Sequence, residues 1–173
     1  MGSMVTQWED GHFVGGHPAL DLANTVFNRA HPVPDNELLR TPSDVLAWCT
    51  AAGVPAAADP DVAEVRAVRE QVWAVFDALA RGGSPPDAPV GALMERAGAG
   101  LRTGSAGIPA VLSLLAVRAL FTLPAERIRA CGRCGWLFLD SSRGGRRRWC
   151  SMSTCGNREK AGRHRRAVRA SGA

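Results

Sequence analysis

The sequence predicts a mainly α-helical fold: an N-terminal helical bundle followed by a small finger with a β-hairpin and a basic helix. Three observations support this prediction. Apolar residues recur at three-to-four spacing through much of the first 122 residues, as on the buried faces of helices. Four of the five cysteines form two close pairs from Cys131 onward, and 13 of the 21 basic residues follow Glu126. We therefore expect a helical domain at residues 10–124 and a finger at residues 126–171.

The first predicted element is a tight turn at Gly15 and Gly16 that enters a helix running to Arg29. Pro18 lies in the first turn of this helix, where a missing amide hydrogen costs nothing. The apolar face of the predicted helix consists of Leu20, Ala23, Val26 and Phe27.

The polar residues of this first segment form the candidate ligand pocket of the helical domain: His17, Asp21, Asn24 and Arg29. On a helix, Asp21, Asn24 and Asn28 would share one face, because they are three to four residues apart. A structural role, in which these side chains cap the helix and bond neighbouring loops, is the favoured alternative.

The remaining helices are predicted by their caps and apolar periodicity. Thr41, Pro42 and Asp44 have the pattern of a capped helix start, and this helix should stop near Gly53. A helix of about 20 residues should follow Asp59, with valines at three-to-four spacing. Two further helices are expected near residues 88–101 and 108–122. The lone Cys49 is expected to fill the core.

Several functional classes find no support in the sequence. It contains no P-loop, no dinucleotide-binding glycine fingerprint and no nucleophile elbow, so we expect no enzyme. It contains no run of about 18 apolar residues that could span a bilayer, and its start lacks the pattern of a signal peptide. We therefore expect a cytoplasmic protein.

The cysteines have the spacing Cys131-x2-Cys134 and Cys150-x4-Cys155, with fifteen residues between the pairs. Four thiolates complete the tetrahedral coordination that structural zinc prefers, so we predict one structural Zn²⁺ held by all four. Iron suits the same sulfur ligands, and disulfides are the less favoured alternative, because the cytosol keeps thiols reduced. Full coordination by cysteine leaves no position for a catalytic water.

The cysteine spacing also predicts the shape of the finger. Residues 136–139 have strand character, and residues 146–149 can return beside them as a hairpin. Cys155 then opens a helix that runs to about Ala170. Two ligands from a knuckle and two from a strand-to-helix junction give a treble-clef-like layout. The miniature core of this finger is expected to consist of Trp136, Phe138 and Trp149.

The two parts of the chain have opposite charge. Residues 126–173 hold 13 Lys and Arg against 3 Asp and Glu, a net charge of +10, whereas residues 1–125 hold 8 against 13, a net charge of −5. A compact positive module is typical of proteins that bind nucleic acid. The alternative is a solvated basic helix that docks on the acidic helical domain. The candidate nucleic-acid contacts are Arg143, Arg146, Arg147 and Arg148 in the hairpin, and Asn157, Arg158, Lys160, Arg163, Arg165, Arg166 and Arg169 in the helix.

Residues 150–158 resemble the CGNR zinc finger, which is named for the run Cys155-Gly156-Asn157-Arg158. The resemblance extends through Cys131, Cys134, residues 135–140, Ser142-Arg143, residues 147–150 and Lys160. Gly15-Gly16 together with residues 20–25, Leu-Asp-Leu-Ala-Asn-Thr, resembles the ABATE domain that usually precedes this finger in bacterial proteins. The resemblance implies a DNA-binding, stress-induced transcriptional regulator.

Three functional hypotheses follow. In the first, the finger grips DNA while the helical domain senses a small molecule or forms a homodimer. In the second, the finger's cations recognise an acidic protein surface and DNA is not bound. The third and least favoured is an enzyme that uses the region of His17, Asp21, Asn24 and Arg29.

Overall fold

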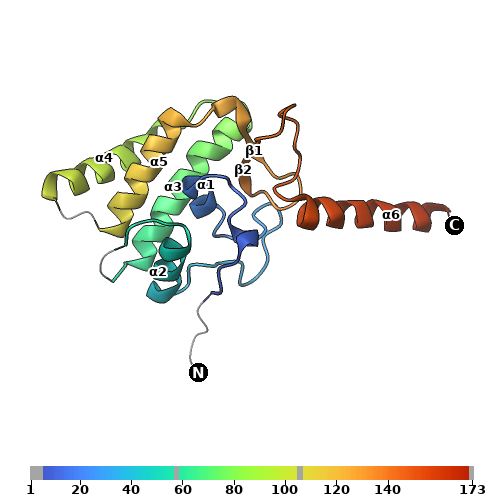
Figure 1. The fold of residues 1–173 in the computed structure, drawn as a ribbon, viewed down its shortest axis with the longest axis horizontal. Helices are drawn as coiled ribbons and strands as arrows, with labels where there is room; N and C mark the ends of the chain where they lie inside the picture. The colour runs from blue at the N-terminus through green and yellow to red at the C-terminus, as the bar shows by residue number, and fades with distance from the viewer. Residues whose placement is uncertain (1–5, 57–58, 105–106, 172–173) are drawn as a thin grey trace, which may run out of the picture.

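The computed structural model describes residues 6–56, 59–104 and 107–171. Within the described residues, five α-helices pack into a bundle, a two-stranded ribbon lies against one end of that bundle, and a sixth α-helix projects away from it (Figure 1). The predicted fold class, a helical domain followed by a small finger, is confirmed. No helix in the described part of the chain is both long and apolar enough to cross a membrane.

Helix α3 (Val62–Ala80) is the centre of the bundle, and α1, α4 and α5 pack around it. Its start is fixed by Asp61, whose side chain accepts hydrogen bonds from the amides of Ala63 (2.8 Å) and Glu64 (3.1 Å). Five apolar side chains at three-to-four spacing are buried on it, which confirms the predicted core helix: Val65, Val68, Val72, Val75 and Phe76.

Helix α2 (Pro42–Ala51) begins at the predicted capping box. The Asp44 amide donates to the Thr41 hydroxyl (3.2 Å), and the Thr41 amide donates to the Asp44 carboxylate (2.8 Å). The Asp44 carboxylate and carbonyl also accept from the Thr6 amide and the Trp8 indole, so this helix start anchors the N-terminal segment. Cys49 is fully buried in the core, as predicted.

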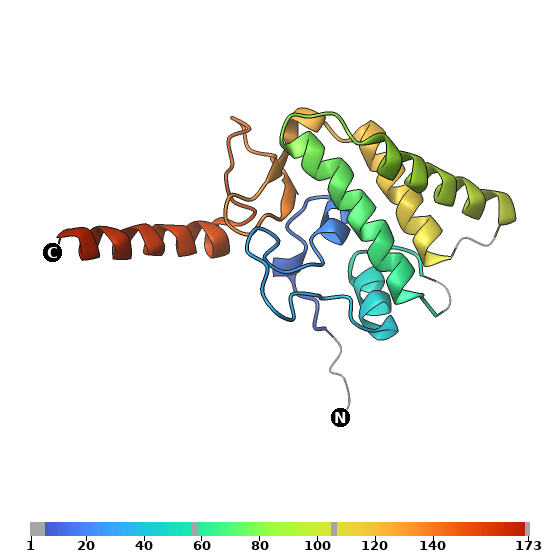
Figure 2. The same ribbon diagram turned by 180° about the vertical axis from the view of Figure 1, so that it is seen from behind.

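Helices α4 (Asp87–Thr103) and α5 (Ile108–Thr122) form an antiparallel pair along α3 (Figure 2). Their bounds lie within two residues of the predicted ones. Helix α4 adds Leu93 to the core, and α5 adds Leu112, Ala116 and Ala119.

The helix predicted up to Arg29 is wrong in length, because α1 (Pro18–Ala23) ends six residues earlier. The chain then turns into an extended stretch in which Val26 bridges Glu37, and the amides of Phe27 and Leu38 donate to the carbonyls of Asn36 and Thr25. These contacts replace the helical hydrogen bonds. Asn28, with a φ of 54°, therefore does not share a helix face with Asp21.

The predicted hairpin partner is also wrong. Strand β2 (Leu137–Leu139) pairs in antiparallel fashion with β1 (Ile128–Ala130), with Arg129 opposite Phe138. Residues 146–149 form no strand. The reason is that β1 and β2 flank the first cysteine pair directly, so its tight turn closes their ribbon.

The ribbon is part of the helical core. Ile128 and Leu137 are fully buried among the side chains of α1, α3 and α5, and β1 and β2 both contact α3. A second, smaller core consists of the four finger cysteines with Trp136 and Phe138, which confirms two of the three aromatic residues expected there. Trp149, the third, is partly buried against it. The ribbon therefore joins the two cores, because Ile128 and Leu137 belong to the larger core and Phe138 belongs to the smaller one.

Candidate metal centre and nucleic-acid interface

The four predicted ligands meet at one point. The Sγ atoms of Cys131, Cys134, Cys150 and Cys155 all lie within 4.8 Å of one another, all four residues are buried, and none forms a disulfide. The Cys134–Cys150 and Cys150–Cys155 Sγ distances are both 3.7 Å. Tetrahedral zinc with Zn–S bonds near 2.3 Å requires sulfurs about 3.8 Å apart. Two of the sulfur–sulfur distances therefore match tetrahedral zinc, and the four sulfurs lie close enough together to form one zinc site.

Hydrogen bonding among the crowded sulfur atoms lowers the pKa of Cys131 and raises the pKa values of Cys134 and Cys150. Hydrogen bonding with the Cys131 thiol, together with burial, raises the pKa of Cys134 to about 12. Contacts with Cys131 and Cys134 raise the pKa of Cys150 as well. A divalent cation between the sulfurs favours the thiolates, because its charge offsets their mutual repulsion.

The first cysteine pair is shaped by backbone hydrogen bonds. The Cys131 amide donates to the Trp136 carbonyl (2.8 Å), and the Gly135 amide donates back to the Cys131 carbonyl (3.0 Å). Gly135 has a φ of 76°, and a Cβ atom there would lie 2.9 Å from the Ala30 amide nitrogen. That amide donates to the Cys134 carbonyl (3.1 Å), so the knuckle docks on the loop after α1.

The second cysteine pair is held by a wide turn, η3 (Met152–Gly156), in which the Gly156 amide donates to the Ser151 carbonyl (3.0 Å). Cys155 lies in this turn, and α6 (Asn157–Ser171) starts two residues later. The prediction that Cys155 opens the helix is therefore wrong, because Cys155 lies in the wide turn that precedes α6. The turn places the Cys155 sulfur beside the other three, while α6 leaves the cluster.

The loop between β2 and Cys150 is ordered by Asp140, a residue whose role was not predicted from the sequence. Its carboxylate accepts from the amides of Ser142 (3.0 Å) and Arg147 (2.8 Å). Hydrogen bonds from Ser142 and Arg147 lower the pKa of Asp140 to about 2. Arg127 and Arg129 brace the same loop by donating to the carbonyls of Ser142 (2.9 Å) and Gly145 (3.2 Å). An aspartate followed by two serines is a local sign of such a turn.

The four arginines of this loop are not equivalent. The Arg147 guanidinium lies 4.9 Å from the Phe138 ring centroid and donates to the Cys150 carbonyl (2.7 Å), so it supports the finger itself. Arg148 lies 5.2 Å from the Trp149 ring centroid but is exposed. Arg143 and Arg146 are also exposed. Three of the four thus remain on a surface that a polyanion could reach.

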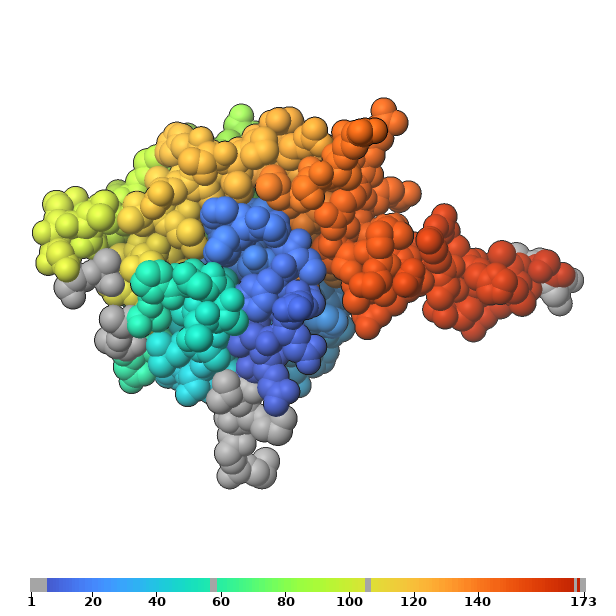
Figure 3. Space-filling model, in the orientation of Figure 1, coloured from blue at the N-terminus to red at the C-terminus, as the bar shows by residue number. Residues whose placement is uncertain are grey.

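Helix α6 carries a dense group of exposed cations. It extends beyond the surface of the rest of the molecule (Figure 3), so in the described part of the chain it does not dock on the helical domain as the alternative expected. Arg166 donates to Glu159 (3.0 Å), and Asn157 donates weakly to the Ser153 carbonyl (3.3 Å). The other predicted contacts on this helix are exposed, and the described residues offer them no acidic partner: Arg158, Lys160, Arg163, Arg165 and Arg169.

The predicted ligand pocket is not formed by its four residues together. Asp21 accepts from the buried Gly15 amide (2.7 Å), and burial raises the pKa of this carboxyl to about 6. Asn24 donates to the Leu137 carbonyl (2.8 Å) and accepts from the Leu137 amide (2.7 Å), so it grips β2. These contacts match the structural alternative.

The other two residues of that set are also engaged separately. His17 caps α1 by accepting from the Ala19 amide (3.1 Å), and it lines a shallow hollow against α5. Arg29 forms a two-pronged ion pair with Glu70 of α3, with both distances 3.0 Å, and its guanidinium lies 5.0 Å from the Trp73 ring centroid. Arg29 therefore ties the loop after α1 to the central helix.

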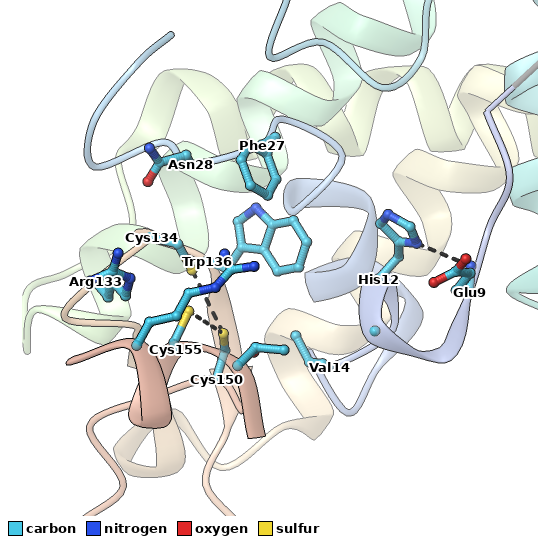
Figure 4. A pocket seen from close by; sticks show the side chains of 13 residues that line it. Glu9, His12, Val14, Phe27, Asn28, Arg133, Cys134, Trp136, Cys150 and Cys155 are labelled. Atoms are coloured by element: carbon cyan, nitrogen blue, oxygen red, sulfur yellow. Dashed lines mark hydrogen bonds between the residues drawn. The ribbon is translucent and has the colours of Figure 1, made fainter. Parts of the chain in front are cut away.

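A different hollow, not predicted from the sequence, lies beside the metal cluster (Figure 4). It has a volume of about 380 Å³ and separates the N-terminal turn from the finger. Its walls come from widely separated segments, which is why no local pattern could reveal it. They include His12, Phe27, Arg133, Trp136 and Arg158.

Comparison with known families agrees with this architecture. Residues 16–126 match the ABATE family, described as "Putative stress-induced transcription regulator", and residues 127–167 match the CGNR zinc finger. No curated protein matches the chain. Because the first match covers more than half of the chain and the second begins at the next residue, with its four cysteines gathered as a zinc site, the protein belongs to the ABATE family and carries a C-terminal CGNR zinc finger.

Proposed function

We propose that this protein is a DNA-binding transcription regulator. Its zinc-stabilised finger presents to the DNA backbone both α6 and the loop between β2 and Cys150, here called the arginine loop, whose exposed arginines are Arg143, Arg146 and Arg148. The observation that carries the proposal is the exposed basic helix: α6 leaves the finger without packing on the bundle, and five of its cations have no acidic partner among the described residues. Zinc has a structural role, because four cysteines fill its coordination sphere, and we propose no enzymatic activity.

The dimensions of α6 suit a DNA groove. Its 15 residues span about 22 Å at the helical rise of 1.5 Å per residue. A helix fits the major groove of B-DNA, which is about 12 Å wide, and cations on several sides of it can reach phosphates on both strands. Arg158, Arg165 and Arg169 recur at seven and four residues, so they form one stripe along the helix.

A homodimer would extend this interface, since one finger supplies a small contact area and two copies could read two half-sites. In this proposal, the acidic helical domain is turned away from DNA, and the finger holds α6 at a fixed angle to it. The support is that β1 and β2 are buried in the helical core rather than linked to it by a free segment.

The proposal can be tested by comparing two triple variants with the same loss of charge. One replaces Arg163, Arg165 and Arg169 on α6 with alanine, and the other replaces Arg81, Arg102 and Arg118, which are exposed on the helical domain. Zinc-loaded protein is incubated with random-sequence duplexes, and the affinity for the selected DNA is measured by fluorescence anisotropy. We expect the α6 variant to bind about tenfold more weakly or worse, because it loses phosphate contacts, and the control to bind like the wild type.

Equal affinities of the two variants, or no DNA binding by the wild type at low salt, would overturn the proposal. In the second case, the hypothesis of a protein-interaction finger predicts that a partner is captured on α6 even after nuclease treatment.

A further inference from the structure

We propose that the hollow beside the zinc cluster is a binding site for a small aromatic carboxylate. Its volume of about 380 Å³ is within the range of small-molecule pockets, which is roughly 300–1,000 Å³. Figure 4 shows its walls: Glu9 and His12 lie on one side, Phe27 and Asn28 on a second, and the cysteines on a third. Trp136 lies in the middle of these three groups. This site goes beyond DNA binding, and it can be tested in DNA-free protein.

Two guanidinium groups provide the anion-binding side of the hollow, Arg133 between the first two cysteines and Arg158 in the first turn of α6. The Arg133 side chain is 40% exposed, and its one ion pair, to Glu159, is long at 3.6 Å. The described residues offer Arg158 neither an ion pair nor a hydrogen bond. Arginine binds carboxylates in a two-pronged geometry, so two guanidinium groups that line one hollow fit an acid group.

Two aromatic rings provide the apolar side. Phe27 and Trp136 meet edge to face, with their ring centroids 6.2 Å apart. The Trp136 indole already donates to the Val26 carbonyl (2.7 Å), so this side chain offers the hollow only apolar ring surface. Phe27 lines the hollow and is 44% exposed, so part of its ring surface is accessible. An aromatic ring can pack against these faces.

The remaining polar groups fix the orientation of the ligand. His12 accepts from the Glu9 amide at Nδ1 (3.0 Å), so its neutral ring carries the proton on Nε2 and can donate from there. A zinc ion with four thiolates carries a formal charge of −2, which repels an acid group placed against the sulfurs. The carboxylate therefore belongs with Arg133 and Arg158, and the ring belongs with Phe27 and Trp136.

Binding at this site would also affect the proposed function. Arg158 lines the hollow and belongs to the cationic stripe of α6, so a carboxylate bound to it withdraws one cation from DNA. This consequence rests on the proposed function, whereas the binding site itself does not.

The site can be tested by isothermal titration of zinc-loaded, DNA-free protein with benzoate and with indole-3-carboxylate, and with acetate for comparison. We expect saturable binding of the aromatic acids and at least tenfold weaker binding of acetate. Arg133→Ala and Phe27→Ala should each weaken the binding of the aromatic acids about tenfold or more. The matched controls Arg143→Ala and Phe121→Ala, exposed residues of the same types away from the hollow, should leave it unchanged.

Absence of saturable binding, equal binding of acetate, or equal effects of the hollow variants and their controls would each overturn the proposal. Failure of this site is distinguishable from failure of the DNA proposal, because Arg133 and Phe27 lie outside the proposed DNA contacts. The Arg133→Ala variant should therefore still bind DNA, and benzoate should no longer weaken that binding.

Discussion

At the scale of single residues, the attachment of the finger depends on positions that accept only one residue type. Gly135 is one of them: its φ of 76° is unfavourable for any residue with a Cβ atom, and that atom would lie 2.9 Å from the Ala30 amide nitrogen. The contact it would disturb joins the cysteine knuckle to the loop after α1.

We predict that Gly135→Ala lowers the free energy of unfolding by about 2 kcal/mol or more, through backbone strain and this close contact. Chemical denaturation of the zinc-loaded protein measures the change. Gly144→Ala is the matched control in the same finger, because Gly144 has an ordinary φ and its nearest neighbour is 4.0 Å away. Similar losses in the two variants would contradict this role of Gly135.

Asp21 illustrates how a buried carboxylate makes stability depend on pH. Burial raises its pKa to about 6 in the folded protein, against about 3.9 in the unfolded chain. The folded state therefore holds the proton more tightly. The stabilisation from that proton is complete below pH 4 and is lost as the pH rises through 6.

We predict that Asp21→Asn, which keeps an oxygen acceptor for the Gly15 amide, gains stability relative to the wild type over this range. The difference should grow by about 2 kcal/mol between pH 4 and pH 7. Denaturation series at several pH values test this. A difference that is constant with pH would contradict the raised pKa.

At the scale of elements, local sequence determined some bounds and tertiary contacts determined others. The capping box at Thr41 and Asp44 and the valine repeat of α3 are local patterns, and the structure confirms both. The end of α1 depends on contacts with residues farther along the chain, because the backbone after Asn24 bonds residues 36–38 instead of continuing the helix. The strand pairing was predicted wrongly because the partner of β2 is a segment of only three residues, Ile128–Ala130, which is too short to show the periodicity of a strand.

Asn24 is one of the residues that link the two family regions. Its side chain satisfies both the amide and the carbonyl of Leu137, which are buried. We predict that Asn24→Ala lowers the free energy of unfolding by about 3 kcal/mol, because two buried backbone groups lose their partners. Asn36→Ala is the control, since the described structure records no hydrogen bond from its side chain. A loss no larger than that of the control, in thermal or chemical denaturation, would contradict the assignment.

The candidate site was predictable in its ligands but not in its surroundings. Cysteine spacing identified the four zinc ligands, because a tetrathiolate site leaves a short, specific pattern. Other features depend on residues that meet only in the folded chain. These are the hydrogen bonds that Asp140, Arg127 and Arg129 make to the arginine loop, and the hollow at Arg133. The same holds for Arg147, whose contacts with Phe138 and Cys150 are structural.

At the scale of the whole molecule, the metal and the bundle should be energetically coupled. Ile128 and Leu137 flank the first cysteine pair and are fully buried in the core of the helical domain. Loss of zinc releases the knuckle between them, so it should destabilise the bundle as well as the finger.

We predict that chelation lowers the melting temperature of the whole chain by roughly 10 °C, on the basis of about 3–4 °C per kcal/mol for a protein of this size. Calorimetry with and without zinc measures this, and metal analysis should give one zinc per chain. Cys131→Ser should lose the metal, whereas Cys49→Ala, in the helical core, should retain it. A bundle that melts at the same temperature without zinc would show that the two parts are independent.

We propose that α6 and the arginine loop form an electrostatic DNA-binding surface, which the zinc finger holds in place. The most direct test is the salt dependence of DNA affinity of the zinc-loaded protein. If four to six of these cations contact phosphates, the logarithm of the association constant should fall with the logarithm of salt concentration with a slope of about −4 to −5, and chelation of zinc should weaken binding. A slope near zero, or DNA affinity that is unchanged after zinc is removed, would contradict the claim.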